Sequence, residues 1–253
     1  MSPTIWTRCG AGRRRRVLDF DAWRVVESQH VISTRKLVDS DAEQQLLESL
    51  IEGAKPPVPK GLEPLHYLLS TPFRHPPLRN GSRFGTRGER GIFYGSLEVE
   101  TALAEVAYYR LLFFEGTAAK LGLVQTDHTA FRVGVRTDKG VDLTRRPFSE
   151  HRALISSPVD YSHAQALGRE MRADGITVAL FSSARDPQGG VNLAMFEPAF
   201  KRNRPSAGTQ VWVCAATREQ VEVKRKNLLK PAAALTFRRQ AFLVEGRLPA
   251  PAV

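Results

Sequence analysis

The sequence predicts an α+β domain with a mixed central β-sheet that is flanked by helices. Segments typical of strands outnumber those typical of helices. Strands and helices also do not alternate in the regular βαβ order that would indicate a parallel sheet. In the segment "TAFRVGVRT" at 129–137, Phe131, Val133 and Val135 alternate with polar or glycine positions, as in a strand that is buried on one face.

The size and composition are those of an ordinary globular protein. The chain has 253 residues, of which 42% are hydrophobic and 25% charged. This length suits one large domain, or one domain with an appended subdomain. No segment approaches the ~18 uninterrupted apolar residues that a membrane-spanning helix needs, so we expect no integral membrane protein.

Residues 1–60 are expected to lie outside the main domain. Residues 1–20 contain the cluster "RRRR" but no following apolar run of signal-peptide length, so we expect a basic flexible tail and a cytoplasmic protein. Residues 21–60 are expected to form a helical extension and a Pro-rich connector. The main domain then covers residues 61–253.

The extension contains an amphipathic helix at 39–53, "DSDAEQQLLESLIEG". Ser40 and Glu43 fit a capping box, and Gly53 ends the helical pattern. The preceding segment "WRVVESQHVIST" favours a short strand or a turn, and the following "AKPPVPKGLEP" favours a connector. The apolar face of the helix consists of Ala42, Leu46, Leu47, Leu50 and Ile51.

The main domain is expected to combine short strands with two long helices. One helix is predicted at 100–114, "ETALAEVAYYRLLFF", and another at 160–175, closed by Gly175. The segment "LHYLLSTPF" at 65–73 is apolar enough for a buried strand or a short helix. Further strands are predicted at 91–95, 176–183, 191–198 and 209–217, with a turn at 184–190.

The cysteines and histidines do not have the spacing of metal ligands. Cys9 and Cys214 are the only two cysteines, so a disulfide framework is not expected. The six histidines occur singly, never as H-x-x-x-H, and C-x-x-C is absent. We therefore expect no metal site.

The chain is strongly basic, with a net charge of +11 and a pI of about 10.1. Such a charge fits a nucleic acid, an acidic protein partner or a phosphate-bearing small ligand. The competing interpretation is a solvated basic surface. Neither a zinc finger nor an RNA-recognition motif accompanies the charge, so a nucleic-acid-binding module remains an alternative function.

The loop "GSRFGTRGERGIFYG" at 81–95 is the first candidate binding segment. Its glycines allow the backbone to approach an anion, and its arginines can bind phosphate with two parallel hydrogen bonds. It lacks the patterns of a P-loop and of a Rossmann site. The competing interpretation is again a solvated loop.

Glu105 is the second candidate, because it lies among Ala, Leu, Val, Tyr and Phe in the helix at 100–114. A carboxylate in apolar surroundings is costly unless it is paired or hydrogen-bonded. Two explanations stay open, a structural ion pair with an arginine and a functional carboxylate. Arg110 lies too far around the helix to be that partner.

The third candidate is "FSSARDPQGGVN" at 181–192, which places Ser182, Ser183, Arg185 and Asn192 at a strand end and in the turn after it. Sites are often built from such polar groups. The serines alternatively cap the turn. The G-x-S-x-G elbow of a nucleophilic serine is absent.

Together these residues resemble the RES domain, a family named for its Arg, Glu and Ser. The matching residues are Arg83 in "GSRFG", Tyr94 in "IFYG", Glu105 in "TALAEVA" and Ser183 in "FSSARD". The resemblance covers roughly residues 65–198, and the N-terminal part with "STRKLVDSDAEQQLLE" resembles the extended members of the family.

The resemblance implies a toxin of a bacterial toxin–antitoxin pair, with a fold similar to diphtheria-type ADP-ribosyltransferases. Such toxins consume NAD+ as a substrate by hydrolysis or phosphorolysis of the nicotinamide–ribose bond, and some members ADP-ribosylate a protein instead. The implied partner is an Xre/MbcA/ParS-type antitoxin that covers the active site in a hetero-oligomer. DNA would be bound only indirectly, through that antitoxin.

The resemblance also implies roles for single residues. Glu105 would stabilise the oxocarbenium-like transition state, and Arg83 would hold the diphosphate. Tyr94 would contact the nicotinamide ribose, and Ser183 would orient the ribose or the carboxamide. Second-rank binding candidates are Arg74, Arg185 and Asn192. Short members often carry Arg-Trp-Asn where this chain has "RFG", which leaves open whether water, phosphate or a protein is the acceptor.

Overall fold

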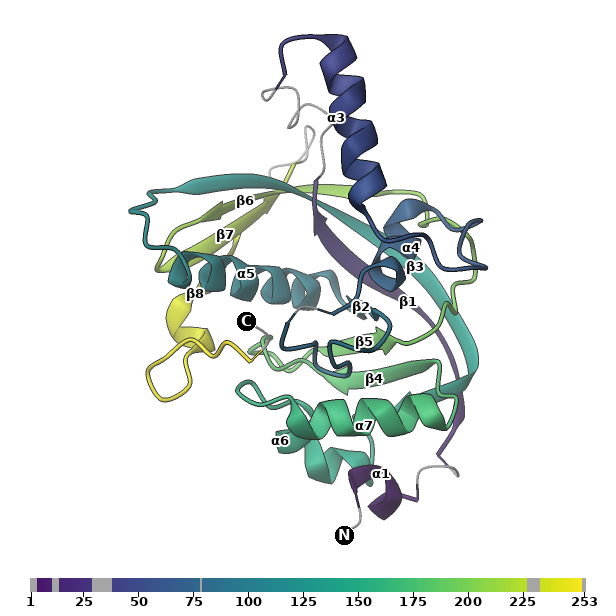
Figure 1. Ribbon diagram of the computed structural model, residues 1–253. Coiled ribbons are helices and arrows are strands. Elements are labelled where there is room, and N and C mark those ends of the chain that lie inside the picture. Colours follow the sequence, from purple (N-terminus) through teal and green to yellow (C-terminus); the bar gives the residue numbers. More distant parts are fainter. Residues whose placement is uncertain (1–3, 11–13, 29–37, 78, 227–232, 252–253) are drawn as a thin grey trace.

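In the computed structural model, which describes residues 4–10, 14–28, 38–77, 79–226 and 233–251, the chain forms an eight-stranded mixed β-sheet with helices around it (Figure 1). The predicted α+β class is confirmed. The strands are β1 (Arg16–Glu27), β2 (Phe93–Ser96), β3 (Val124–Asp142), β4 (Val178–Ser182), β5 (Val191–Met195), β6 (Gln210–Ala216), β7 (Gln220–Arg225) and β8 (Leu235–Arg238).

The strand pairings close a ring. The order β1-β2-β5-β4-β3 returns to its start because β3 also pairs with β1, and β6, β7 and β8 continue the sheet from β3. Among the described strands, β3 and β4 are the one pair that runs parallel. The long strand β3 shows the predicted alternation, since Phe131, Val133 and Val135 are buried whereas Arg132 and Arg136 are exposed.

Two long helices pack on this sheet and meet the predictions made for them. In the view of Figure 1, α5 lies above β5 and α7 lies below β4. Helix α7 is followed by Gly175 in a left-handed conformation, as expected. The helices are α1 (Ile5–Arg8), α3 (Asp41–Ala54), α4 (Tyr67–Arg74), α5 (Val99–Glu115), α6 (Arg152–Ile155) and α7 (Ser162–Ala173).

The hydrophobic core of the described residues has three clusters, two of which hold α7 and α5. Under α7, Leu167 and Met171 pack with Phe84 and Phe181. Under α5, Leu111 and its neighbours pack with Trp212 and Val221 from β6 and β7. Because α5 is buried along most of its length, its position relative to the sheet is fixed.

The expectation of a flexible tail at residues 1–20 is wrong for the described part of that segment. Trp6 of α1 is buried, stacks on Phe148 with ring centroids 5.7 Å apart and donates a hydrogen bond to Asp174. Residues 16–27 form β1, which pairs with β2 and β3 and therefore belongs to the main sheet. Leu18 alternates with exposed neighbours in this strand, a signal that the adjacent arginines mask.

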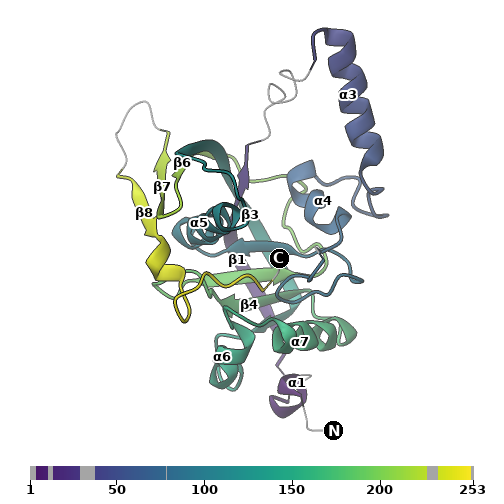
Figure 2. The ribbon, with the colours of Figure 1, turned by 60° about the vertical axis from the view of Figure 1, so that its left-hand side comes forward.

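The helix predicted at 39–53 is present as α3, but its apolar face is not buried. Ser40 Oγ accepts a hydrogen bond from the Glu43 amide, and Glu43 accepts one from the Asp39 amide, which is close to the predicted capping box. Leu46 and Leu50 are more than 60% exposed. Figures 1 and 2 show this helix extending away from the sheet.

The structure decides between the alternatives that the sequence left open for two further segments. The apolar segment at 65–73 forms a helix, α4, and not a strand. The strand or turn expected at 23–34 is a strand as far as residue 27, and residues 29–34 lie outside the described residues. Among the helices of the described residues, none has the length and hydrophobicity to cross a membrane.

Gly168 tests how tightly α7 must pack against the loop before β2. A Cβ at Gly168 would lie 2.1 Å from the carbonyl oxygen of Phe84, which is backbone and cannot move aside cheaply. We therefore expect Gly168→Ala to lower the free energy of unfolding by about 1–3 kcal/mol, as measured by urea denaturation.

The matched control is Gly53→Ala in α3, where nothing lies within 4 Å of the added Cβ. There the higher helix propensity of alanine should raise the free energy of unfolding by about 0.5–1 kcal/mol. An equal gain in both variants would show that the approach of Phe84 to α7 is not tight.

Candidate active site

A cavity of about 540 Å³ lies where α5, β1, β2 and β5 meet the loop that precedes β2. Four of the residues expected at a site line it, namely Arg83, Tyr94, Glu105 and Asn192. They come from four different segments of the chain. The cavity is therefore the candidate site, because tertiary packing has brought these separate motifs together.

Glu105 is held by neutral hydrogen-bond donors. Its Oε1 accepts hydrogen bonds from Ser183 Oγ at 2.8 Å and from Asn192 Nδ2 at 2.6 Å. Within the described chain it forms no ion pair and Oε2 has no hydrogen-bond partner. The structural ion pair that the sequence left open is thus not what the described residues show, and a negative charge is presented to the cavity.

Ser183 holds this carboxylate from a position outside the cavity lining. Its Oγ accepts hydrogen bonds from the backbone amides of Arg185 and Asp186, at 3.1 and 3.0 Å, so its own proton is directed to Glu105. It is 4% exposed and does not line the cavity. In this structure Ser183 therefore acts through Glu105, where the sequence predicted a contact with the ligand.

Asn192 extends the support to a residue that the sequence analysis missed. Its Oδ1 accepts a hydrogen bond from Ser96 Oγ at 2.7 Å, while its amide nitrogen binds Glu105. Ser96 and Asn192 are 2% and 5% exposed and face each other from β2 and β5. The bond from Ser96 fixes which end of the amide points to the carboxylate.

Arg83 is a buried cation without a carboxylate partner among the described residues. Its Nη1 donates to the carbonyl oxygens of Ile155 and Ser157, at 3.2 and 2.9 Å. Its guanidinium lies 4.5 Å from the centre of the Tyr161 ring, which also lines the cavity. Because carbonyl dipoles and a ring face hold it, the full positive charge stays available to an anionic ligand.

Tyr94 joins β2 to the loop that carries Arg83. Its hydroxyl lies 3.0 Å from Ser82 Oγ and accepts a hydrogen bond from the Phe84 amide at 3.1 Å. Burial raises the pKa of Tyr94 to about 12, so the phenol stays neutral at physiological pH. Besides any contact with a ligand, Tyr94 thus fixes the loop that carries Arg83.

Arg24, on β1, is a second cation of this cavity, and the sequence analysis did not select it. Its Nη1 donates to the Tyr94 carbonyl at 2.6 Å, and its guanidinium lies 4.8 Å from the centre of the Phe93 ring. Its buried Nε has no hydrogen-bond partner, and burial lowers the pKa of Arg24 to about 10. The signal in the sequence was a single charge in the apolar strand "AWRVV".

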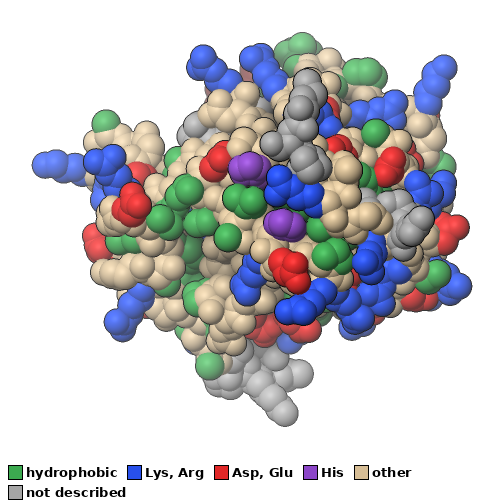
Figure 3. Space-filling view, turned by 90° about the horizontal axis from the view of Figure 1, so that it is seen from below, with side chains coloured by type: hydrophobic (Ala, Val, Ile, Leu, Met, Phe, Trp, Pro, Cys, Tyr) green, Lys and Arg blue, Asp and Glu red, His purple; other side chains and the backbone are tan. Residues whose placement is uncertain are grey.

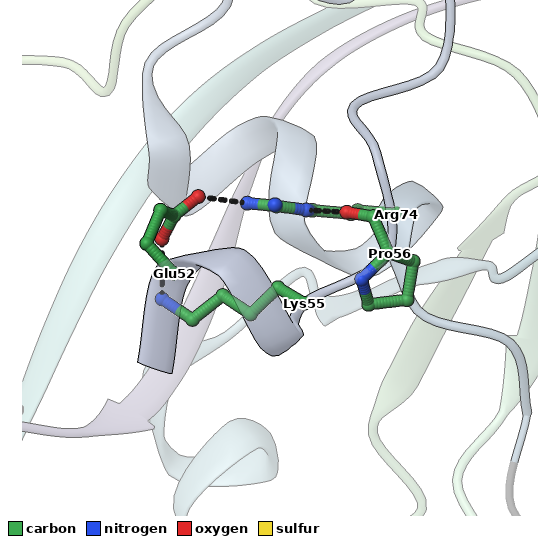
Figure 4. A network of polar contacts seen from close by, with 4 residues as sticks. All are labelled: Glu52, Lys55, Pro56 and Arg74. Atoms are coloured by element: carbon green, nitrogen blue, oxygen red, sulfur yellow. Dashed lines mark hydrogen bonds and ion pairs between the residues drawn. The ribbon is translucent and has the colours of Figure 1, made fainter. Parts of the chain in front are cut away.

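Two of the second-rank candidates lie elsewhere. Arg74 binds Glu52 at 2.7 Å and the Pro56 carbonyl, and so joins α4 to the end of α3 (Figure 4). Arg185 is 4% exposed, covers the Tyr108 ring at 3.7 Å and donates to the Pro158 carbonyl. Neither lines the cavity, so both contacts are structural.

Metal sites and nucleic-acid interfaces are two other kinds of site that the described residues bear on. They contain no group of three or more His, Cys, Asp or Glu side chains able to hold a metal ion. On the face shown in Figure 3, Lys and Arg side chains are interspersed with acidic and apolar ones. That face offers no uninterrupted basic surface of the kind that nucleic-acid backbones select.

The cavity contains a carboxylate and two arginines, so it can bind a molecule that has both positive and negative groups. A fixed carboxylate can stabilise a positive charge that develops on a sugar carbon, as glycosidic carboxylates do. Two arginines, with no carboxylate partner in the described residues, can bind the phosphates of the same molecule. The aromatic residues Tyr109 and Tyr161 also line the cavity and can pack against a flat ring of a ligand.

Comparison with known protein families matches residues 59–215 to the RES domain. This span includes all four residues on which the resemblance was based. It also extends beyond the predicted 65–198 at both ends. A comparison with curated proteins finds no match.

The hydrogen bonds to Glu105 predict how its variants fold. Glu105→Leu leaves the buried Ser183 hydroxyl and Asn192 amide without their acceptor, which should lower the free energy of unfolding by about 1–3 kcal/mol. Glu105→Gln retains an acceptor oxygen and should stay within about 1 kcal/mol of the unmodified protein. Chemical denaturation measures both, and equal stability of the two variants would contradict the proposed hydrogen bonds.

Proposed function

Since the chain belongs to the RES domain family, we propose that it is the toxin of a bacterial toxin–antitoxin pair and that it degrades NAD+ in the cytoplasm. The bond to be cleaved joins nicotinamide to ribose. The observation that carries this proposal is the Glu105 carboxylate, fixed by Ser183 and Asn192 in the cavity that Arg24 and Arg83 also line.

The substrate chemistry suits this arrangement. NAD+ combines a cationic nicotinamide ring with an anionic diphosphate, so it needs aromatic walls, a carboxylate and cations in one cavity. Arg83 and Arg24 would bind the diphosphate, and the rings of Tyr109 and Tyr161 would enclose the nicotinamide and its ribose. Binding at the diphosphate would hold the reacting ribose beside Glu105.

The reaction would proceed by loss of nicotinamide. The electron pair of the bond between C1 of the ribose and the ring nitrogen leaves with the nitrogen, which makes nicotinamide neutral. The ribose then carries a positive charge, which Glu105 stabilises. Water that attacks C1 and loses a proton gives ADP-ribose, whereas phosphate gives the corresponding 1-phosphate.

The proposed partner is an antitoxin protein of the Xre/MbcA/ParS type that covers the cavity in a hetero-oligomer. Tyr109 and Phe113 are about half exposed on the helix that carries Glu105, and both offer apolar surface to such a protein. Any binding to DNA would then be a property of the antitoxin.

The same exposed side chains favour one second candidate, a protein ADP-ribosyltransferase. In that reaction a side chain of a target protein, docked beside Tyr109, would attack the ribose in place of water. Radiolabelled NAD+ separates the two functions, because only the transferase leaves label on protein.

NAD+ cleavage by the purified chain tests the main proposal. We expect nicotinamide release, quantified by chromatography with and without phosphate, and a rate that falls at least about 100-fold in Glu105→Gln. The stability of Glu105→Gln, determined as above, controls for unfolding. Absence of nicotinamide release from folded, antitoxin-free protein would refute the proposed activity, and an unchanged rate in Glu105→Gln would refute the role of the carboxylate.

A further inference from the structure

A second cavity, of about 250 Å³, adjoins the first. It is lined by the end of β1, by α4 and by Thr129 of β3, and it shares Arg24 and Pro72 with the first cavity. Glu105 does not line it. A substrate held beside Glu105 therefore has a place for a second part on the far side of Arg24.

The walls of this second cavity have the chemistry of a nucleoside site. Tyr67 lines it and is 59% exposed; its ring centre lies 4.6 Å from that of His66, and the part of the ring away from His66 can stack on a base. The hydroxyls of Ser28 and Thr129 lie 2.8 Å apart at another part of the wall. These hydroxyls can exchange hydrogen bonds with ribose hydroxyls, whereas the Glu27 carboxylate is already paired with Arg110 of α5.

Arg24 lies at the junction of the two cavities. Its charge is stabilised only by the Tyr94 carbonyl and the Phe93 ring among the described residues, and its Nε is buried without a partner. Leaving a half-buried cation without an anion costs free energy. A phosphate group between the two cavities would offset that cost by binding Arg24 where it lines both of them.

The first cavity therefore contains a carboxylate and aromatic residues, and Arg24 lines both cavities. The second, smaller cavity contains an exposed tyrosine ring and hydroxyl groups. We propose that the second cavity binds the adenosine half of the dinucleotide, with Tyr67 stacking on the adenine. This inference rests on the proposed function and adds a binding residue, Tyr67, from outside the recognised motifs.

Two substrates that share the scissile bond test the inference. NAD+ has the adenosine half, whereas nicotinamide mononucleotide lacks it. Tyr67→Ala should lower kcat/KM for NAD+ about tenfold, mainly through KM, because one stacked base is lost. For nicotinamide mononucleotide the same variant should leave kcat/KM unchanged.

Two more variants sharpen the comparison. Thr71→Trp adds a large side chain at an exposed position of α4 that lines only the second cavity. It should also lower kcat/KM for NAD+ and leave kcat/KM for nicotinamide mononucleotide unchanged. Leu46→Ala in α3 is the matched control, because Leu46 is 61% exposed, close to Tyr67 at 59%, but lines neither cavity. This control should leave kcat/KM unchanged for both substrates.

Equal losses for both substrates in Tyr67→Ala and Thr71→Trp, or no loss in either, would overturn the inference. Failure of the unmodified protein to cleave either substrate would refute the proposed activity alone. Isothermal titration of ADP-ribose then still decides the inference without turnover. Its dissociation constant should rise about tenfold in Tyr67→Ala, and the absence of binding or of a change would overturn the subsite.

Discussion

The candidate site depends on one constraint, which is that a carboxylate must keep its charge inside a largely apolar helix. An arginine partner would stabilise that charge and also neutralise it toward any ligand. Here two neutral donors, Ser183 and Asn192, bind one oxygen of Glu105 instead. Each donor comes from a different strand end, so the site exists only where α5, β4 and β5 are in register.

The buried arginines are likewise held by neutral groups, which leave their positive charge uncancelled. Arg83 and Arg185 donate to carbonyl oxygens of the segment between α6 and α7, and each lies against a tyrosine ring. Carbonyls and rings hold a guanidinium in place while they leave its charge uncancelled. Buried charges without counter-charges are costly, so this arrangement lowers stability. At Arg83, which lines the cavity, it is also the pattern expected where an anionic substrate completes the site, whereas Arg185 lies outside the cavity.

Much of the fold could be predicted because the pattern of apolar residues in a long segment indicates which of its positions are buried. The helix around Glu105 is apolar on nearly all sides, the strand at 129–137 alternates, and the motif residues Arg83 and Tyr94 do line the cavity. What the sequence could not show is pairing across the sheet. Ser96 meets Asn192, and Arg24 meets the cavity, only because β1, β2 and β5 are neighbours, and no local period encodes that neighbourhood.

The closure of the strand ring has a consequence for the timing of synthesis. Arg24 lies near the start of the chain and Asn192 lies in its last third, yet both line one cavity. The first strand must therefore wait for β5 to leave the ribosome before the ring and the carboxylate support can form. A nascent chain that has not yet reached β5 therefore has no assembled site, and under the proposed function it cannot cleave NAD+.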